Sequence, residues 1–405
     1  MTSKKLFATY FIFFIFIYIM YLAFYYPQIT TEPVEYPETR QLYDYRGVTH
    51  THSSLSSGSG NIDDIAAAAQ AAELDFIYIT DLNDFDRSSK NKEGVYGNLL
   101  LFVAGEYTYL DSKFLNYHNT TNEHLSSVGR IQLGFSELLE QKNRPLDKGI
   151  FVLSHPLKPG YKWDGNIPEG MDGIEVINLK SQWQQWWEAS KTSFLFTSLL
   201  YPINGRLAFI RLLQRPIKNI RLWDQLNKGD RYTIGFVGNE AEALAKVFKK
   251  YPIEVPSYRF MFNVATNHIL LKSELTGEFL SDKRKIQSAL ENGQFYMSYD
   301  YLAKPVGFEA YLEKGLEKIV AMGKNANVSA PAELTINLPS NLTAPSKIAI
   351  MKDGQVFMTT NSNRVKVDLT VPGDYRIEVQ TKVPLPAPDH ARWMPWIYTN
   401  PFSIR

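Results

Sequence analysis

The sequence predicts an α/β protein in which a parallel β/α barrel follows an N-terminal membrane helix and precedes a β-sandwich. Three features predict it: an apolar run opens the chain, short apolar runs then alternate with helical patterns, and regularly spaced short strands begin near residue 306. We expect an anchor over 1–27, a linker over 28–44, a barrel over 45–305 with a helical insertion over 178–231, and a β-sandwich over 306–405.

The opening run, Leu6 to Tyr26, carries no charge and would reach roughly 30 Å as a helix, enough to cross a bilayer. The small-residue cleavage site of a secretory peptide is missing, so we expect an uncleaved anchor rather than a signal peptide or a buried core helix. Lys4 and Lys5 precede the run, whereas three glutamates follow it before the next basic residue. The positive-inside rule then predicts a single-pass protein of the cell (inner) membrane, with a cytoplasmic N-terminus and the main domain on the outer or periplasmic side.

Composition limits the partners and the chemistry. The 405 residues carry a formal net charge of +1, which gives no reason to expect a nucleic-acid partner. The chain has no cysteine and only seven histidines, so any metal site must be built from His, Asp and Glu side chains.

Polar residues follow successive apolar strands of the predicted barrel. The strand-like runs are Phe76 to Thr80, Leu99 to Ala104, Ile150 to Leu153, Ile174 to Ile177 and Tyr232 to Val237, and an Ala-rich helix capped by Asn61 follows the opening histidine pair. Because the carboxyl ends of barrel strands converge on one mouth, the residues after these strands should become neighbours. These residues are His50, His52, Asp81, Glu106, His155 and Glu240, and we expect them to form a metal cluster.

The motifs at these positions carry a resemblance. GVTHTHSS, DFIYITDLND, FVAGEY, EHLSSVG, VLSHP, GIEVIN and GFVGNEAEA resemble the polymerase-and-histidinol-phosphatase (PHP) superfamily of metal-dependent phosphoesterases, from about Tyr45 to Ala243. The resemblance implies a distorted (β/α)7 barrel with up to three divalent ions at its mouth. It implies one metal held by His50, His52, Glu106 and Glu240, and a second that shares Glu106 and is held by His155 and one more histidine.

Two residues compete to be that histidine. His124 is followed by Leu125-Ser126-Ser127-Val128-Gly129, which fits the family pattern, whereas the residues after His118 do not. We therefore expect His124 to be the ligand and keep His118 as the alternative.

Departures from the family pattern suggest two ions rather than three. Leu82, Gly58 and Glu242 stand where the family usually has histidines, and only Glu242 could still bind a metal. We expect two divalent ions, Zn, Mn or Fe. Asp81 would have a catalytic role behind the ligands, orienting a histidine or the water, or would simply cap the following loop.

A two-ion site of this kind suits hydrolysis by metal-bound hydroxide. The leading hypothesis is a phosphoesterase acting on a small-molecule or lipid- or glycan-linked ester. The alternatives are a carboxyl-ester or carbamate hydrolase, and a catalytically degenerate binding protein.

Three further features lie outside this cluster. The insertion is rich in Trp and Arg, and two interpretations stay open: helices at the bilayer interface, or a helical hairpin packed on the barrel. His268 lies in an apolar strand and should be structural, and His390 should lie in a surface loop.

Overall fold

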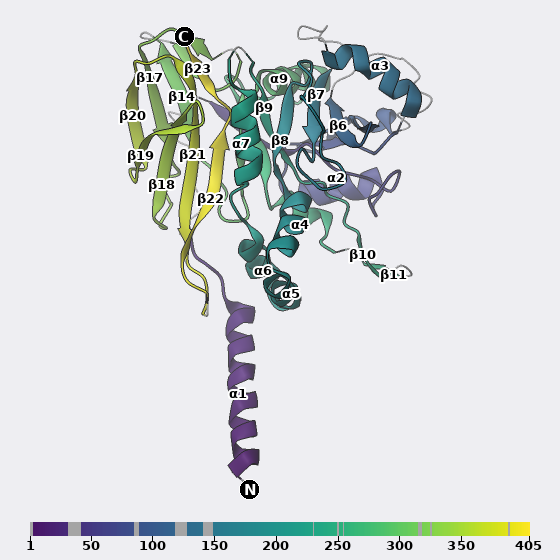
Figure 1. The fold of residues 1–405 in the computed structure, drawn as a ribbon, viewed down its shortest axis with the longest axis vertical. Coiled ribbons are helices and arrows are strands. Elements are labelled where there is room, and N and C mark those ends of the chain that lie inside the picture. The colour runs from purple at the N-terminus through teal and green to yellow at the C-terminus, as the bar shows by residue number, and fades with distance from the viewer. Residues whose placement is uncertain are drawn as a thin grey trace.

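A computed structural model describes residues 3–30, 42–84, 89–117, 128–140, 149–229, 231–248, 251–253, 255–314, 318–324, 326–387 and 389–405. The protein is a mixed α/β structure from which one helix projects (Figure 1). The other helices are α2 (Ile62–Ala71), α3 (Val128–Glu140), α4 (Leu179–Ala189), α5 (Lys191–Leu200), α6 (Gly205–Leu212), α7 (Ile217–Leu226), α8 (Tyr258–Phe262) and α9 (Phe279–Asn292), with a 3-10 turn at Lys90–Lys92.

The projecting helix is α1 (Ser3–Phe24), which leaves the body at its lower end in Figure 1. Its segment Lys4–Phe24 is long and apolar enough to cross a membrane, and only 6% of its most apolar window is buried. The prediction of an apolar N-terminal helix is confirmed, whereas its membrane topology stays a prediction.

One twelve-stranded sheet runs through the molecule. Across the sheet its strands are β16 (Asn327–Val328), β23 (Phe402–Ile404), β21 (Gly373–Val383), β22 (Arg392–Thr399), β13 (Phe295–Ser298), β12 (Thr266–Leu271), β1 (Tyr43–Val48), β2 (Phe76–Ile79), β4 (Leu99–Val103) and β3 (Gly94–Tyr96), with β18 (Ser346–Lys352) beside β21 and β19 (Gln355–Thr360) beside β18. Because β22 pairs antiparallel with β13, the sheet continues across the boundary predicted at residue 306.

Two smaller sheets and a hairpin complete the strands. The five-stranded sheet contains β5 (Gly105–Tyr109), β6 (Ser112–Tyr117), β7 (Ile150–Ser154), β8 (Gly173–Asn178) and β9 (Ile234–Gly238). The four-stranded sheet contains β15 (Lys318–Ala321), β14 (Glu309–Lys314), β17 (Ala332–Asn337) and β20 (Arg364–Leu369), and β10 (Ala245–Phe248) forms a hairpin with β11 (Tyr251–Ile253).

The strands of the predicted barrel are only partly parallel. β1, β2 and β4 pair in parallel, as do β7, β8 and β9, but β12 and β6 join their neighbours antiparallel. Single bridges, Thr51 with Ala241 and Leu82 with Glu106, connect the two sheets. The five strand-like runs named from the sequence each pair in parallel with a neighbour, while β6 and β12 add antiparallel pairings, and the closed (β/α)7 barrel stays a prediction.

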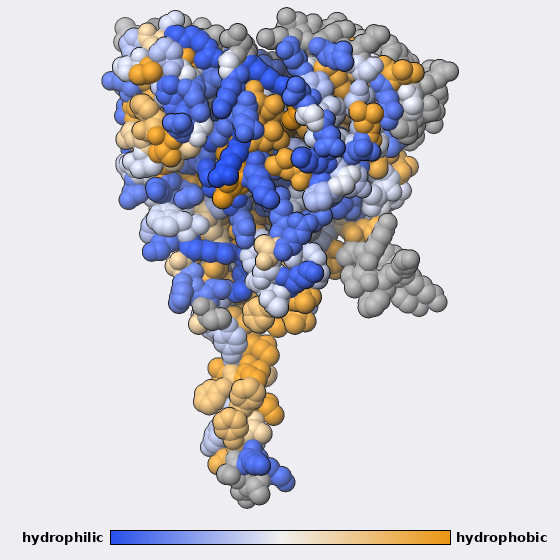
Figure 2. Space-filling view, in the orientation of Figure 1, coloured by the Kyte–Doolittle hydropathy of each residue, from blue (hydrophilic) through white to orange (hydrophobic). Residues whose placement is uncertain are grey.

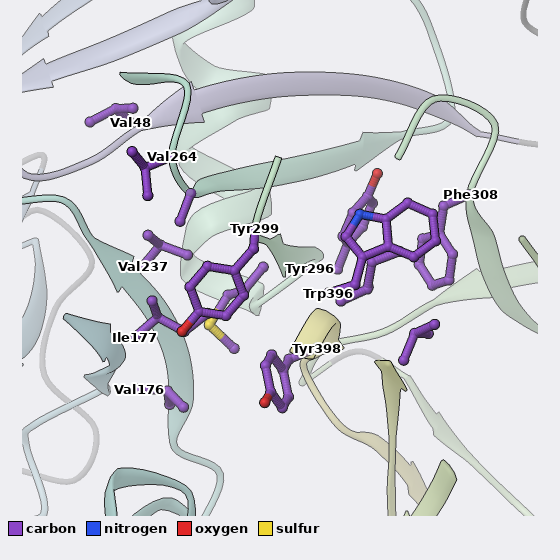
Figure 3. Packing of buried hydrophobic residues seen from close by; sticks show 14 of the residues in the cluster. Val48, Val176, Ile177, Val237, Val264, Tyr296, Tyr299, Phe308, Trp396 and Tyr398 are labelled. Carbon is purple, nitrogen blue, oxygen red and sulfur yellow. The ribbon is translucent and has the colours of Figure 1, made fainter. Parts of the chain in front are cut away.

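The core joins the large sheet to the helical layer and to the C-terminal strands. Figure 3 shows Val48 and Val237 of the predicted barrel in one cluster with Trp396 and Tyr398 of β22. Trp396 is fully buried, and its indole nitrogen donates to the carbonyl of Ala303 at 2.8 Å. This packing fixes the strands whose ends build the site.

His268 belongs to a buried ion network at the opposite end of β1 from His50. Its Nδ1 lies 2.9 Å from Asp44 and its Nε2 lies 3.1 Å from Asp300, which also pairs with Arg46. Burial lowers the pKa of His268, but Asp44 and Asp300 outweigh it and raise the pKa to about 9. His268 thus contributes to the structure, and His390 is exposed outside helix and strand, as the sequence suggested.

This network predicts a pH dependence of stability. Because the folded-state pKa of His268 is raised above its unfolded value near 6.5, its contribution is complete below that value and is lost as pH rises through about 9. We expect His268→Gln to remove this slope, worth a few kcal/mol, in urea unfolding measured between pH 6 and pH 10. The exposed His390→Gln variant should keep it, and a slope unchanged in His268→Gln would contradict the assignment.

Candidate metal centre

His50 and His52 follow β1 and point to the same place. The residues after β1 run beside those after β9, through the bridge of Thr51 with Ala241 and the bond from His52 N to Ala241 O at 3.0 Å. Both imidazoles are buried, and their Nε2 atoms lie 3.1 Å apart. Two histidines one residue apart in an extended segment are expected to share a face, and these two do.

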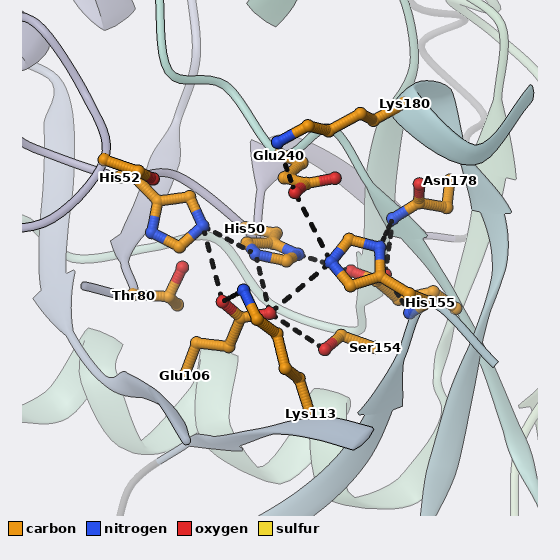
Figure 4. A network of polar contacts seen from close by, with 12 residues as sticks. His50, His52, Thr80, Glu106, Lys113, Ser154, His155, Asn178, Lys180 and Glu240 are labelled. Carbon is orange, nitrogen blue, oxygen red and sulfur yellow. Dashed lines mark hydrogen bonds and ion pairs between the residues drawn. The ribbon is translucent and has the colours of Figure 1, made fainter. Parts of the chain in front are cut away.

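Glu106 completes a group of three residues that could hold a metal ion. Its carboxylate oxygens lie 3.7 Å from Nε2 of His50 and 3.7 Å from Nε2 of His52 (Figure 4). The ligand atoms of the three residues all lie within 4.8 Å of one another, and all three side chains are buried. Glu106 follows the strand Leu99–Val103, as the sequence predicted. It belongs, however, to a separate strand, β5, rather than to a loop.

The ring protons of His50 and His52 are directed away from the centre. Nδ1 of His50 lies 2.6 Å from a carboxylate oxygen of Glu175, which can only accept. Nδ1 of His52 lies 3.3 Å from the hydroxyl of Ser56, whose hydrogen goes to Asp81 at 2.6 Å. The Nε2 atoms of both rings face each other and the carboxylate of Glu106, and when both rings carry their proton on Nδ1 these nitrogens offer two lone pairs to a cation.

Glu175 is held in place by a close approach of the backbone. Its second oxygen accepts from the side-chain amide of Asn178 at 2.7 Å and from His155 N at 3.2 Å. A Cβ atom on Gly238 would lie 1.9 Å from the Glu175 carboxylate, so only glycine leaves room for it. A carboxylate of β8 thereby orients a histidine that follows β1.

His155 and Glu240 form the other side of the centre. Nε2 of His155 lies 3.5 Å from Glu106 and 3.4 Å from Glu240. Both residues have positive φ, 51° and 46°, a strained conformation that places their side chains at the ends of β7 and β9. Glu240 thus lies against the predicted second-metal ligand, whereas the sequence had grouped it with His50 and His52.

His155 differs from the first two histidines in its tautomer. The amide nitrogen of Asn178 donates to Nδ1 of His155 at 3.0 Å, so the ring proton is on Nε2. Within the part of the chain that the structure describes, Nε2 of His155 and Oε2 of Glu240 are buried without a hydrogen-bond partner. A cation at this nitrogen would have to displace the proton and turn the Asn178 amide, so His155 fits a metal less completely than His50 and His52 do.

Three lysines surround the carboxylates. Lys113 donates to Glu106 at 2.9 Å, and Lys180 donates to Glu240 at 2.8 Å and to Glu242 at 3.0 Å. Lys158 lies 3.8 Å from Glu240. The ring of Tyr161, 38% exposed, lies about 5 Å from the ammonium groups of both Lys113 and Lys158.

These neighbours set the charge states of the centre. Burial raises the pKa of Glu106, but His155, His50, His52 and Lys113 together hold it well below its usual value. Burial also raises the pKa of Glu240, yet His155, Lys180 and Lys158 lower it to about 2. Burial lowers the pKa of His52. Burial also lowers the pKa of His50, but Glu175 and Glu106 outweigh it and raise that pKa. The two ionised carboxylates and the neutral His52 are in the states that a metal requires, whereas His50 must give up a proton to bind one.

Asp81 and Glu242 hold the loop after His52. Asp81 accepts from Ser53 N at 2.7 Å and from the hydroxyls of Ser53 and Ser56, so it reaches His52 only through Ser56. Glu242 accepts from Ser57 at 2.8 Å as well as from Lys180. Neither the role of Asp81 behind the ligands nor ligation by Glu242 is tested, and both stay predictions.

The loop also explains one departure from the family pattern. A Cβ atom on Gly58 would lie 2.1 Å from the carbonyl oxygen of His52 and 2.4 Å from the hydroxyl of Tyr258. That hydroxyl donates to the same carbonyl at 2.7 Å, so the space beside Gly58 is filled. A histidine at this position would displace Tyr258.

The two competing histidines, His118 and His124, lie outside the described residues. Sequence reasoning assigned no role to Glu175, Lys113, Lys158 or Lys180. A carboxylate within the apolar strand GIEVIN was a usable signal for Glu175, because an unpaired buried charge is costly. Lys113 gave no signal, since its position depends on the antiparallel pairing of β5 with β6.

Substituting Gly238 tests the link between Glu175 and His50. The added methyl of Gly238→Ala would push the Glu175 carboxylate away and release the His50 ring, and zinc affinity should fall about 10- to 100-fold. The measurement is competition with a chromophoric chelator. Gly94→Ala is the matched control, because nothing lies within 4 Å of its added Cβ. Wild-type affinity in Gly238→Ala would contradict the role given to Glu175.

Comparisons with known proteins give this chain a structural likeness and no match to a family model or a curated protein. Among solved structures, it is similar to a two-domain protein from Bacteroides vulgatus described as containing a predicted PHP-like metal-dependent phosphoesterase. The two chains are 13% identical, the TM-score is 0.38, and the match covers 91% of this chain and 99% of the other.

Proposed function

We propose that the protein is a membrane-anchored, metal-dependent hydrolase that acts on phosphate esters. The observation that carries this proposal is the buried convergence of the Nε2 atoms of His50 and His52 with the Glu106 carboxylate. In this proposal His50, His52 and Glu106 hold the first ion, and Glu106 and His155 hold a second together with His124. A divalent ion in such a site activates water and polarises a phosphoryl oxygen.

The residues around the ion have separable tasks. Glu175 fixes the His50 ring through Nδ1, and Asp81 fixes the loop of His52 through Ser53 and Ser56. Asn178 positions both Glu175 and His155. The rings of His50 and His52 are thereby oriented before an ion binds, which reduces the cost of ordering the first site, whereas His155 requires the Asn178 amide to turn.

The lysines favour an anionic substrate over a neutral ester or carbamate. Lys113, Lys158 and Lys180 place three ammonium groups around the ligand carboxylates, and the side chain of Lys180 is 40% exposed. Once a cation neutralises those carboxylates, the ammonium groups can donate to phosphoryl oxygens. A neutral carboxyl ester would leave them without a partner.

One contact favours a second candidate function. The ammonium of Lys113 lies 2.9 Å from Glu106, so it already neutralises part of the charge that an ion would meet. If the lysines replaced the ions, the protein would be a binding protein without hydrolytic activity. Metal analysis separates this candidate from the enzyme.

Loss of the shared carboxylate should remove both metal and activity. We expect the purified full-length protein to bind about two equivalents of Zn, Mn or Fe, as a dinuclear site requires, and to hydrolyse bis-p-nitrophenyl phosphate. Glu106→Gln and His50→Ala should lose the ion and the turnover, because both remove a ligand of the first ion. Elemental analysis and initial rates measure this, with His390→Ala as control. One equivalent of bound metal per protein would support the first ion site only. No bound metal at micromolar supply would contradict the proposed enzymatic function.

Replacing Lys180 tests the class of substrate. Lys180→Met should raise KM for p-nitrophenyl phosphate about tenfold, roughly 1.4 kcal/mol of lost binding, while Lys180→Arg should keep most of it. Turnover of neutral p-nitrophenyl acetate should change little in either variant. Zinc affinity should not weaken, since the ammonium competes for Glu240. An equal loss on both substrates would favour the carboxyl-ester alternative.

A further inference from the structure

Helix α5 exposes an apolar stripe. Leu195, Phe196 and Leu199 are 53%, 45% and 73% exposed, and their spacing places them on one face of the helix. Thr197 and Leu200 are buried and attach the opposite face to the body. The insertion is therefore a packed helical segment that leaves one apolar face uncovered by the described residues.

The stripe lies where α1 meets the body. The side chain of Asn204, in the connection from α5 to α6, donates to the carbonyls of Leu22 and Tyr25 at 2.9 and 2.8 Å. The guanidinium of Arg206 lies 3.9 Å from the ring centre of Tyr26. In Figure 1, α5 and α6 are beside the upper end of α1, and Figure 2 shows apolar surface continuing from α1 onto the adjoining part of the body.

The surface of α1 indicates what covers this stripe. From residue 4 to residue 17 its side chains are exposed all round, as Phe7 and Ile12 illustrate at 73% and 66%. With 22 residues it is about 33 Å long, close to the thickness of a bilayer core. Tyr21 and Tyr26 lie near its C-terminal end, the position that tyrosines take at a membrane interface.

We infer that α5 lies in the interface of the bilayer that α1 spans, with Leu195, Phe196 and Leu199 in contact with lipid. This inference rests on the proposed membrane anchor. The occupant is a phospholipid surface rather than a second protein, because the stripe continues the apolar surface of α1 at the level where that helix ends. Exposed Lys191, at the start of α5, is placed to meet headgroup phosphates.

The absence of cysteine from the chain permits a direct test with single labels. Leu199→Cys and Phe196→Cys in the full-length protein would carry an environment-sensitive nitrobenzoxadiazole label, in vesicles of phosphatidylcholine and phosphatidylglycerol. Leu133→Cys is the matched control, since Leu133 is 75% exposed on α3, far from α1 in Figure 1. Ile12→Cys reports the anchor itself.

We expect lipids with nitroxide-labelled acyl chains to quench the labels at 199 and 196 about twofold or more, as for groups in the interface. The label at 12 should be quenched most by nitroxides near the chain ends, and the label at 133 should not be quenched. Quenching at 12 without quenching at 199 and 196 would overturn the placement of α5 and leave the anchor intact. No quenching at 12 would overturn both, whereas hydrolytic activity is independent of either result.

Discussion

The structure of the centre depends on one constraint, the complete burial of the ionised Glu106 carboxylate. A buried charge of this kind is tolerated only when cations and hydrogen-bond donors surround it. Ser154 donates to one oxygen at 2.9 Å and Lys113 to the other, and the imidazoles of three histidines face the same carboxylate. The strand ends that carry these residues are therefore arranged around a negative charge, which is the physical requirement for attracting a cation.

Backbone strain at two residues and a close packing contact at a third maintain this arrangement. His155 and Glu240 adopt left-handed conformations that cost of order 1–3 kcal/mol each. Gly238 has no side chain, and the space this leaves is occupied by the Glu175 carboxylate, which contacts His50. These residues lie at or just beyond the ends of β7 and β9, two strands that are fully buried and paired with β8. The sheets supply the stability, and they hold these two strained residues where their side chains face the centre.

Local patterns in the sequence predicted the parts that depend on local chemistry. Asn61 caps α2, with Asp64 completing a capping box, and His50 and His52 meet as their spacing indicates. The pairing of β22 with β13 depends on contacts between distant segments, which no local pattern encodes, whereas β5 forms a hairpin with the adjacent β6. The sequence grouped Glu240 with His50 and His52, and its positive φ also brings it to His155 and Lys180, so which ion it would bind stays a prediction.

Helix α4 connects the centre to the face that we place at the membrane. Asn178 caps α4 through Ser181 N while its amide group holds Glu175 and His155, so the start of the helix is fixed by the residues of the centre. Lys180 lies in the first turn, and Ser190 ends α4 and caps α5. Eleven residues span about 16 Å. Because both ends of α4 are capped, the distance between the ligand carboxylates and the exposed stripe of α5 is set by a short rigid element rather than by a loop.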